Sequence, residues 1–91
     1  MVEVAFPGSD LVRQGVEDLA QRRDSIPALL VLIGAPRLRA LGLPVPDTDI
    51  DAPEHRLYQK LWQEDPDSAH SRYNALVRRL VSFERAMECA S

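Results

Sequence analysis

The stretch IPALLVLIGAP, residues 26–36, contains no polar side chain. Interpreted as a β-strand entering a glycine turn, it would suggest the start of a nucleotide-binding βα unit. The chain offers no second comparable strand, although a parallel sheet needs several. The residues around Gly34 also follow neither the G-x-G-x-x-G nor the G-x-x-x-x-G-K-[ST] spacing. Both observations argue against a phosphate-binding strand.

The flanks of this stretch carry helix signals instead. Ser25 is a suitable N-cap, because its hydroxyl can accept a hydrogen bond from a free backbone N–H of the first turn. Pro27 falls in that first turn, where a missing N–H has no cost. Gly34 and Pro36 are typical of a helix end. The sequence therefore predicts a helix over residues 26–33 that is apolar on every side.

A helix without a polar face has to be surrounded by other elements. Amphipathic helices are predicted over residues 10–23, 52–64 and 66–89, because apolar residues recur there at helical spacing. A short helix is also expected over residues 36–41, because Pro36 can begin a helix but cannot continue one. The predicted fold class is all-α, a small bundle of four to five helices with a central all-apolar helix.

Polar side chains at the start of each amphipathic segment are expected to cap it, since they can accept hydrogen bonds from the first backbone N–H groups. Asp51 and Glu54 have the spacing of a capping box, with Pro53 in the first turn. The other expected caps are Ser9 or Asp10 for the first segment, and Asp65 or Asp67 for the last.

The sequence LPVP, residues 43–46, predicts an extended segment, because a residue before proline avoids the helical region. We expect a strap laid across the bundle with Leu43 and Val45 turned toward it. A polyproline-type ligand for an aromatic groove is the alternative.

The acidic loop over residues 47–51 resembles the start of a calcium loop, D-x-D-x-D. Such a loop needs glycine at its sixth position and a bidentate glutamate at its twelfth. This chain has Ala52 and Tyr58 at those positions. We therefore interpret the loop as a solvated acidic segment and predict no metal site.

The length of 91 residues favours one domain, predicted as residues 9–91 after an N-terminal arm of residues 1–8. The net charge of −3 gives no general attraction to nucleic acid. Cys89 is the only cysteine, which excludes an intramolecular disulfide and a cysteine-based zinc site. No signal peptide is apparent, and no apolar run reaches the ~20 residues of a membrane helix. We expect a cytoplasmic protein.

The predicted arm has an alternating pattern, with Val2, Val4 and Phe6 on one side. Three interpretations remain open: an arm that docks on the bundle, an arm that adds to the edge of another chain, and a disordered end.

No residue pattern indicates catalysis. His55 and His70 lack the spacing of a metal-binding pair, and we interpret both as exposed polar residues. Cys89 has no histidine base near it in the sequence, and no serine lies in a G-x-S-x-G context. We therefore predict that the protein is not an enzyme and needs no cofactor.

Glu84 falls inside the apolar arc of the last predicted helix. Because an unpaired buried carboxylate is unfavourable, we expect this helix end to project past the core. The alternatives are that Glu84 meets an arginine, a tyrosine hydroxyl or a partner chain.

The surplus of apolar helix surface leads to three functional hypotheses. The first is a non-enzymatic interaction or accessory module, a homodimer or the partner of another helical protein. The second, weakened by Glu84 and Glu88, is a small nucleic-acid-binding regulator that uses the last helix. The third is an accessory subunit with a small-molecule pocket. The candidate partner or ligand contacts are Tyr58, Trp62, His70, Tyr73 and Glu84, and the candidate nucleic-acid contacts are Arg72, Arg78, Arg79 and Arg85.

Overall fold

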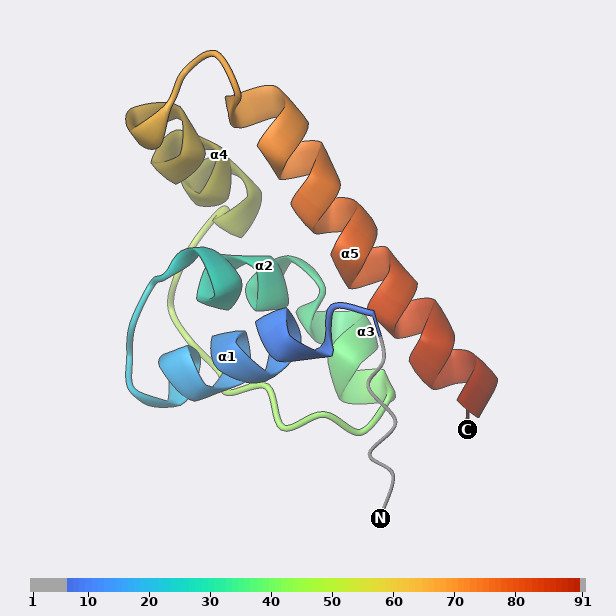
Figure 1. The fold of residues 1–91 in the computed structure, drawn as a ribbon. Coiled ribbons are helices and arrows are strands. Elements are labelled where there is room, and N and C mark those ends of the chain that lie inside the picture. The colour runs from blue at the N-terminus through green and yellow to red at the C-terminus, as the bar shows by residue number, and fades with distance from the viewer. Residues whose placement is uncertain (1–6, 91) are drawn as a thin grey trace.

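The computed structural model describes residues 7–90, and all the regular secondary structure in that range is helical. The prediction of an all-α bundle is confirmed (Figure 1). Residues 1–6, which make up most of the predicted arm, and residue 91 lie outside the described range. The helices are α1 (Ser9–Ala20), α2 (Ile26–Ile33), α3 (Ala35–Ala40), α4 (Pro53–Glu64) and α5 (Ala69–Ala90).

Helix α2 is the centre of the bundle, as the sequence predicts. Ser25 caps it, because the Ser25 hydroxyl accepts a hydrogen bond from the N–H of Ala28 at 3.2 Å. Helix α2 contacts α1, α3, α4 and α5. The side chains of residues 28–31 have 0% exposure, so the middle of α2 is enclosed on every side. Its two ends are less covered, since Ile26 and Ile33 are half-buried.

Helices α1 and α2 approach each other closely at Gly15. A Cβ atom at this position would overlap the carbonyl oxygen of Pro27 and the Cγ2 atom of Val31. Glycine is the residue that allows two backbones to come this close. This contact anchors α1 to the central helix.

Two of the expected helix caps are wrong, because the residues before α1 and α4 adopt left-handed conformations. The N-cap of α1 is Gly8, with φ of 77°, and not Ser9 or Asp10. The N-cap of α4 is Ala52, with φ of 48°, and not Asp51 of the predicted capping box. Neither Gly8 nor Ala52 makes a side-chain capping hydrogen bond. At both helix starts, the backbone conformation of the preceding residue sets where the helix begins, and the capping preference of the nearby polar side chains does not.

The last helix begins three residues later than predicted. Residues 65–68 form a turn in which the carbonyl of Asp65 accepts a hydrogen bond from the N–H of Ser68 at 3.2 Å. The Asp65 side chain accepts from the N–H of Asp67 at 3.2 Å. Asp65 therefore stabilises the turn between α4 and α5 and not the first turn of α5.

The C-terminus of α1 ends in a Schellman motif. The N–H of Arg23 donates to the carbonyl of Asp18 at 2.8 Å, and the N–H of Arg22 donates to the carbonyl of Leu19 at 3.0 Å. Arg22 has φ of 61°, although this position favours glycine. The Asp18 side chain, which is buried, accepts hydrogen bonds from the Ser25 hydroxyl at 2.5 Å and from Gln14 at 3.0 Å.

The proline-rich segment 43–46 forms the expected strap. Val45 is buried, and Leu43 is half-buried against the core. The guanidinium of Arg39 donates hydrogen bonds to the carbonyls of Val45 and Pro46, each at 3.2 Å. The strap is thus tied to α3 by its backbone and to the core by its side chains.

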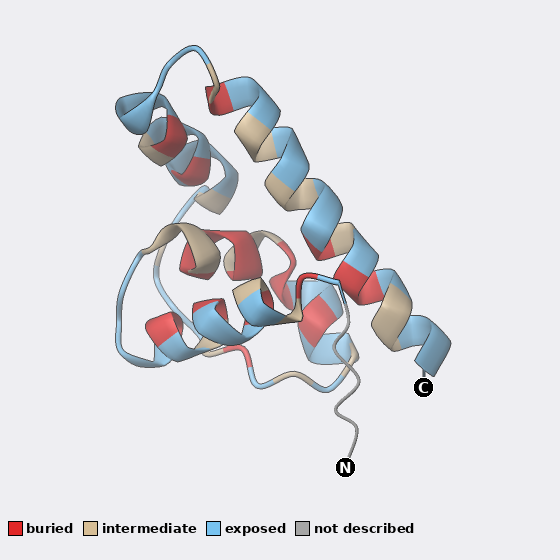
Figure 2. Cartoon of the chain, in the orientation of Figure 1, coloured by how far each residue is buried: buried red, intermediate tan, exposed pale blue. Residues whose placement is uncertain are grey.

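The molecule consists of two parts, which we name the body and the hairpin. The body is α1, α2, α3 and the strap, and the hairpin is α4, the turn 65–68 and α5. The hairpin helices run in opposite directions, and their connected ends project from the body (Figure 1). The extents of 41 × 27 × 22 Å reflect this elongated arrangement. Buried residues concentrate in α2 and around it, whereas the hairpin alternates buried and exposed residues (Figure 2).

Candidate interaction surface

Large aromatic side chains reach the solvent on the hairpin. Trp62 is 54% exposed and Tyr58, one turn earlier on α4, is 37% exposed. The ring of Tyr58 meets the ring of Tyr73 edge-on, with the centroids 5.9 Å apart and an interplanar angle of 62°. The three residues come from both helices of the hairpin, and Tyr58 and Tyr73 join the helices through an aromatic contact.

Helix α5 carries further apolar side chains after Tyr73. Val77 and Val81 follow Tyr73 at intervals of four residues, so the three side chains lie along one side of the helix. Val77 and Val81 are half-buried, yet only Tyr73 of the three packs against the core. We name Tyr58, Trp62, Tyr73, Val77 and Val81 the hairpin face.

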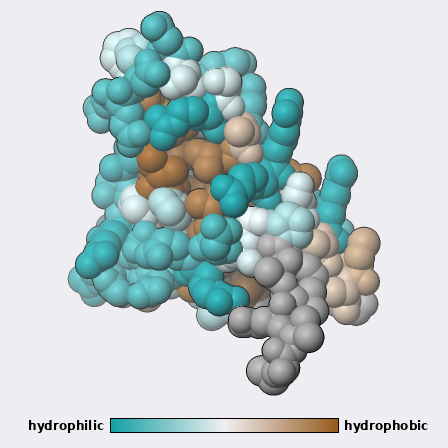
Figure 3. All heavy atoms as spheres, in the orientation of Figure 1, coloured by the Kyte–Doolittle hydropathy of each residue, from teal (hydrophilic) through white to brown (hydrophobic). Residues whose placement is uncertain are grey.

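The hairpin face carries no formal charge at neutral pH. Partial burial and, to a smaller extent, the negative charge of Glu54 raise the pKa of the Tyr73 hydroxyl above its ordinary value of 10.0, and the hydroxyl is neutral at pH 7 in either case. Residues of high hydropathy also reach the surface between the hairpin and the body in the view of Figure 3. The region around the hairpin therefore has more apolar surface than the helices of this molecule cover.

The structure does not bring all five predicted partner or ligand contacts together. Tyr58, Trp62 and Tyr73 belong to the hairpin face. His70 is exposed, and one of its ring nitrogens lies 3.3 Å from the amide of Asn74. Glu84 lies eleven residues after Tyr73, which is about 16 Å along the helix. A single ligand pocket formed by all five residues is therefore not present.

The expectation that Glu84 projects into solvent is wrong. Glu84 is only 4% exposed, because this part of α5 lies against the body. Its Oε1 atom is 3.8 Å from Nη1 of Arg37, so the alternative in which it meets an arginine is the observed one. Arg37 also donates a hydrogen bond to Glu88, through Nε at 2.8 Å. Burial raises the pKa of the Glu84 carboxyl, and the charge of Arg37 opposes this only in part.

Arg37 is a partner that the sequence analysis missed. It lies on the short helix α3, 47 positions before Glu84, and no local spacing connects the two residues. A Cβ at Gly34 would lie 3.0 Å from Oε2 of Glu84, so the glycine before α3 makes room for the carboxylate. Neither the pairing nor the room for it could be found without knowing that the fold brings Arg37 next to the C-terminal half of α5.

The four candidate arginines for nucleic acid do not form one free basic face. Arg72 pairs with Glu64 at 3.0 Å, and Arg79 pairs with Asp10 at 3.4 Å. Arg78 and Arg85 are exposed, but they lie on a different side of α5 from Arg72. This arrangement does not favour a continuous path for a phosphate backbone.

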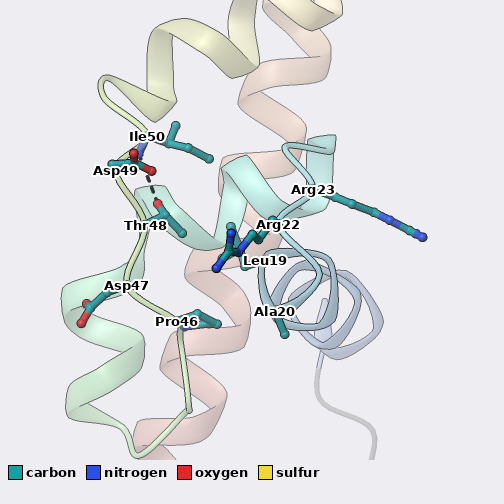
Figure 4. A pocket seen from close by; sticks show the side chains of 9 residues that line it. All are labelled: Leu19, Ala20, Arg22, Arg23, Pro46, Asp47, Thr48, Asp49 and Ile50. Atoms are coloured by element: carbon teal, nitrogen blue, oxygen red, sulfur yellow. Dashed lines mark hydrogen bonds between the residues drawn. The ribbon is translucent and has the colours of Figure 1, made fainter.

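Two surface cavities lie away from the hairpin face. The first, of about 620 Å³, lies between the end of α1 and the acidic loop. Arg22 points into it toward the loop that carries Thr48, whereas Arg23 points away (Figure 4). The second, of about 500 Å³, is a mainly apolar groove between α1, the strap and α5. None of the candidate contacts from the sequence lines either cavity.

No protein-family model, curated protein or solved structure matches this chain. Among residues 7–90, no helix is both long and apolar enough to cross a membrane. In the same range, no group of three or more histidine, cysteine, aspartate or glutamate side chains is arranged to hold a metal ion.

Proposed function

We propose that the protein is a non-enzymatic helical interaction module that forms a homodimer through the hairpin face. The observation that carries the proposal is Trp62, which is 54% exposed beside the exposed Tyr58. Tryptophan and tyrosine are the residues most often responsible for binding energy at protein interfaces. A surface that exposes two such side chains next to each other resembles the centre of an interface more than an ordinary solvated surface.

A second copy of the chain suits this surface for a geometric reason. An antiparallel helix pair covers only one side of each helix, and here α2 covers part of another side. Two hairpins related by a twofold axis would form a four-helix arrangement, in which each copy covers the apolar face of the other. The same five residues would then contribute from both copies.

We propose a binding module in preference to an enzyme or a nucleic-acid regulator. Two of the four candidate arginines already pair with carboxylates. The lone thiol of Cys89 is exposed, which suits a reducing compartment such as the cytoplasm.

The test is sedimentation equilibrium over a wide dilution series, with the unaltered chain and two variants. We expect a reversible monomer–dimer equilibrium for the unaltered chain. Trp62→Glu should shift it to monomer, because a charge would be buried at the centre of the interface. The matched control is Gln63→Glu, which adds the same charge at the next exposed position, about 100° further around α4.

The control variant should associate like the unaltered chain. A chain that is monomeric at every concentration would overturn the proposal. Association that Trp62→Glu and Gln63→Glu weaken equally would also overturn it, because a general charge effect would then explain the loss.

A further inference from the structure

The apolar groove on the body is a second surface that the helices leave open, and it is distinct from the hairpin face. It has a volume of about 500 Å³ and lies between α1, the strap and the C-terminal half of α5. The polar residues Arg13 and Glu17 lie at its edge and are exposed. The apolar side chains that line it are Val12, Val16, Ala20, Leu43, Pro44, Phe83 and Met87.

The chain enters α1 at one end of this groove. Ser9, the first residue of α1, is part of the groove lining. Gly8 before it is buried with φ of 77°, and a Cβ there would lie 2.8 Å from the backbone oxygen of Arg79. Only glycine fits this turn, which holds the start of α1 against α5. Residues 1–6 are therefore attached to the molecule directly beside the groove.

The length of the groove matches the reach of these residues. Along α1 it extends from Ser9 to Ala20, which is about 16 Å at the rise of an α-helix. Five residues in an extended conformation span about 17 Å. Residues 2–6 can thus follow the whole groove and need no residue from α1 to unwind.

The side-chain pattern of residues 2–6 also matches. In an extended segment, alternate side chains point to the same side, so Val2, Val4 and Phe6 share one side and Glu3 lies on the other. A groove lined mainly by valine, leucine, phenylalanine and methionine suits the three apolar side chains, and the solvent suits Glu3.

We propose that residues 2–6 bind in this groove of the same molecule, with Val2, Val4 and Phe6 placed between α1 and α5. The bound segment joins α1 to the C-terminal half of α5. This inference does not depend on the hairpin face, and it holds for a monomer as well as for a dimer.

Methyl NMR of the full chain tests the proposal. The sequence has two methionines, Met1 and Met87, so methionine-methyl labelling gives a simple spectrum with a probe inside the groove. We expect nuclear Overhauser contacts between the Met87 methyl group and the Phe6 ring. The double variant Val4→Ser with Phe6→Ser should remove them and shift the Met87 methyl resonance.

The matched control is Glu3→Ser, which changes the same segment on its opposite side. It should leave the contacts and the Met87 resonance as they are. All three substitutions lie before α1, and far-UV circular dichroism checks that the helices are retained.

Two outcomes would overturn the proposal. The first is a Met87 resonance that does not respond to the double variant. The second is contacts that appear only between differently labelled molecules in a mixed sample, because the groove would then bind the segment of a second copy.

Discussion

Helices α2 and α4 are both short, and both carry large apolar side chains, but their surroundings differ. In α2, residues 28–31 have 0% exposure. In α4, Leu57 and Leu61 are equally buried, whereas Trp62 next to them is 54% exposed. The central helix has neighbours on all sides, whereas α4 packs mainly against α2 and α5.

The difference follows from the size of the chain. A domain of about 90 residues can surround one helix completely, but it has too little chain to surround the next layer as well. The body is therefore built around the enclosed helix α2, whereas the hairpin keeps an apolar face that no other helix covers completely. Substitutions in the two regions should have effects of different size and kind.

The largest effect is expected in the body. Leu30→Ala removes a side chain with 0% exposure and should lower the free energy of unfolding by about 3–5 kcal/mol, because it leaves a cavity in the central helix. Trp62→Ala, measured by urea denaturation at a concentration where the chain is monomeric, should cost less than about 1 kcal/mol. Comparable losses for the two variants would contradict the contrast between the regions.

The next effect concerns the close approach of α1 and α2. Gly15→Ala should lower the free energy of unfolding by about 1–3 kcal/mol, because the added methyl group overlaps Pro27 and Val31. Gly42→Ala is the comparison, since φ is +94° there but a Cβ would meet nothing within 4 Å. It should cost about 1 kcal/mol, from backbone strain alone. A stabilising effect of Gly15→Ala in thermal unfolding would show that the two helices separate easily.

Two carboxylates are buried within the described part of the chain, and they should respond to pH in opposite directions. The first, Asp18, belongs to the body. The hydrogen bond from Ser25, followed by that from Gln14, lowers the pKa of Asp18 below its ordinary value of 3.8. The folded chain therefore keeps this charge where the unfolded chain takes up a proton, and stability is lost as the pH falls below 3.8. Asp18→Asn should lower the free energy of unfolding at pH 7, with a difference from the unaltered chain that shrinks in acid.

The contribution of Glu84 on α5 to folding stability changes with pH in the opposite direction. Burial raises its pKa above the ordinary value of 4.5, so the folded chain holds the proton more strongly than the unfolded chain. Stability therefore falls as the pH rises from 4.5 through the raised pKa of the folded chain. Glu84→Gln should therefore raise the free energy of unfolding at pH 7, and the advantage should disappear below pH 4.5. The control is Glu88→Gln on the same helix, which is exposed and should not gain stability. A Glu84→Gln variant that is less stable at pH 7 would show that the pair with Arg37 outweighs burial.

The smallest effects are expected at the two non-glycine residues that have left-handed backbones within residues 7–90. Arg22 ends α1 in the body with φ of 61°, and Ala52 precedes α4 in the hairpin with φ of 48°. Replacing either by glycine should raise the free energy of unfolding by about 0.5–1 kcal/mol, because glycine adopts this conformation without strain. Gln21→Gly, at φ of −94°, should give no gain. Calorimetric melting of the three variants makes the comparison.

The sequence predicted best where the structure depends on local signals. The bounds of α2 follow from Ser25, Pro27 and Gly34, and the observed helix begins and ends where they indicate. The strap follows in the same way from its prolines. The two N-caps were wrong, since the conformations of Gly8 and Ala52 depend on how the chain reaches the next helix.

The features of the site that could not be predicted depend on contacts between residues far apart in the sequence. The aromatic residues Tyr58, Trp62 and Tyr73 could be named from the sequence, but their contact needs the α4–α5 pairing. Glu84 could be recognised as unusual, but its partner Arg37 comes from another helix. The groove on the body could not be predicted at all, because it is formed by three segments that meet only in the fold.

The fluorescence of Trp62 during dilution tests most directly whether the hairpin face is covered by a second copy. Trp62 is the only tryptophan in the chain, so its emission reports on this surface alone. We predict a short-wavelength emission at high concentration that shifts to the long wavelength of a solvated indole on dilution, with the same midpoint as the change in mass. An emission typical of a solvated indole at every concentration would contradict the account.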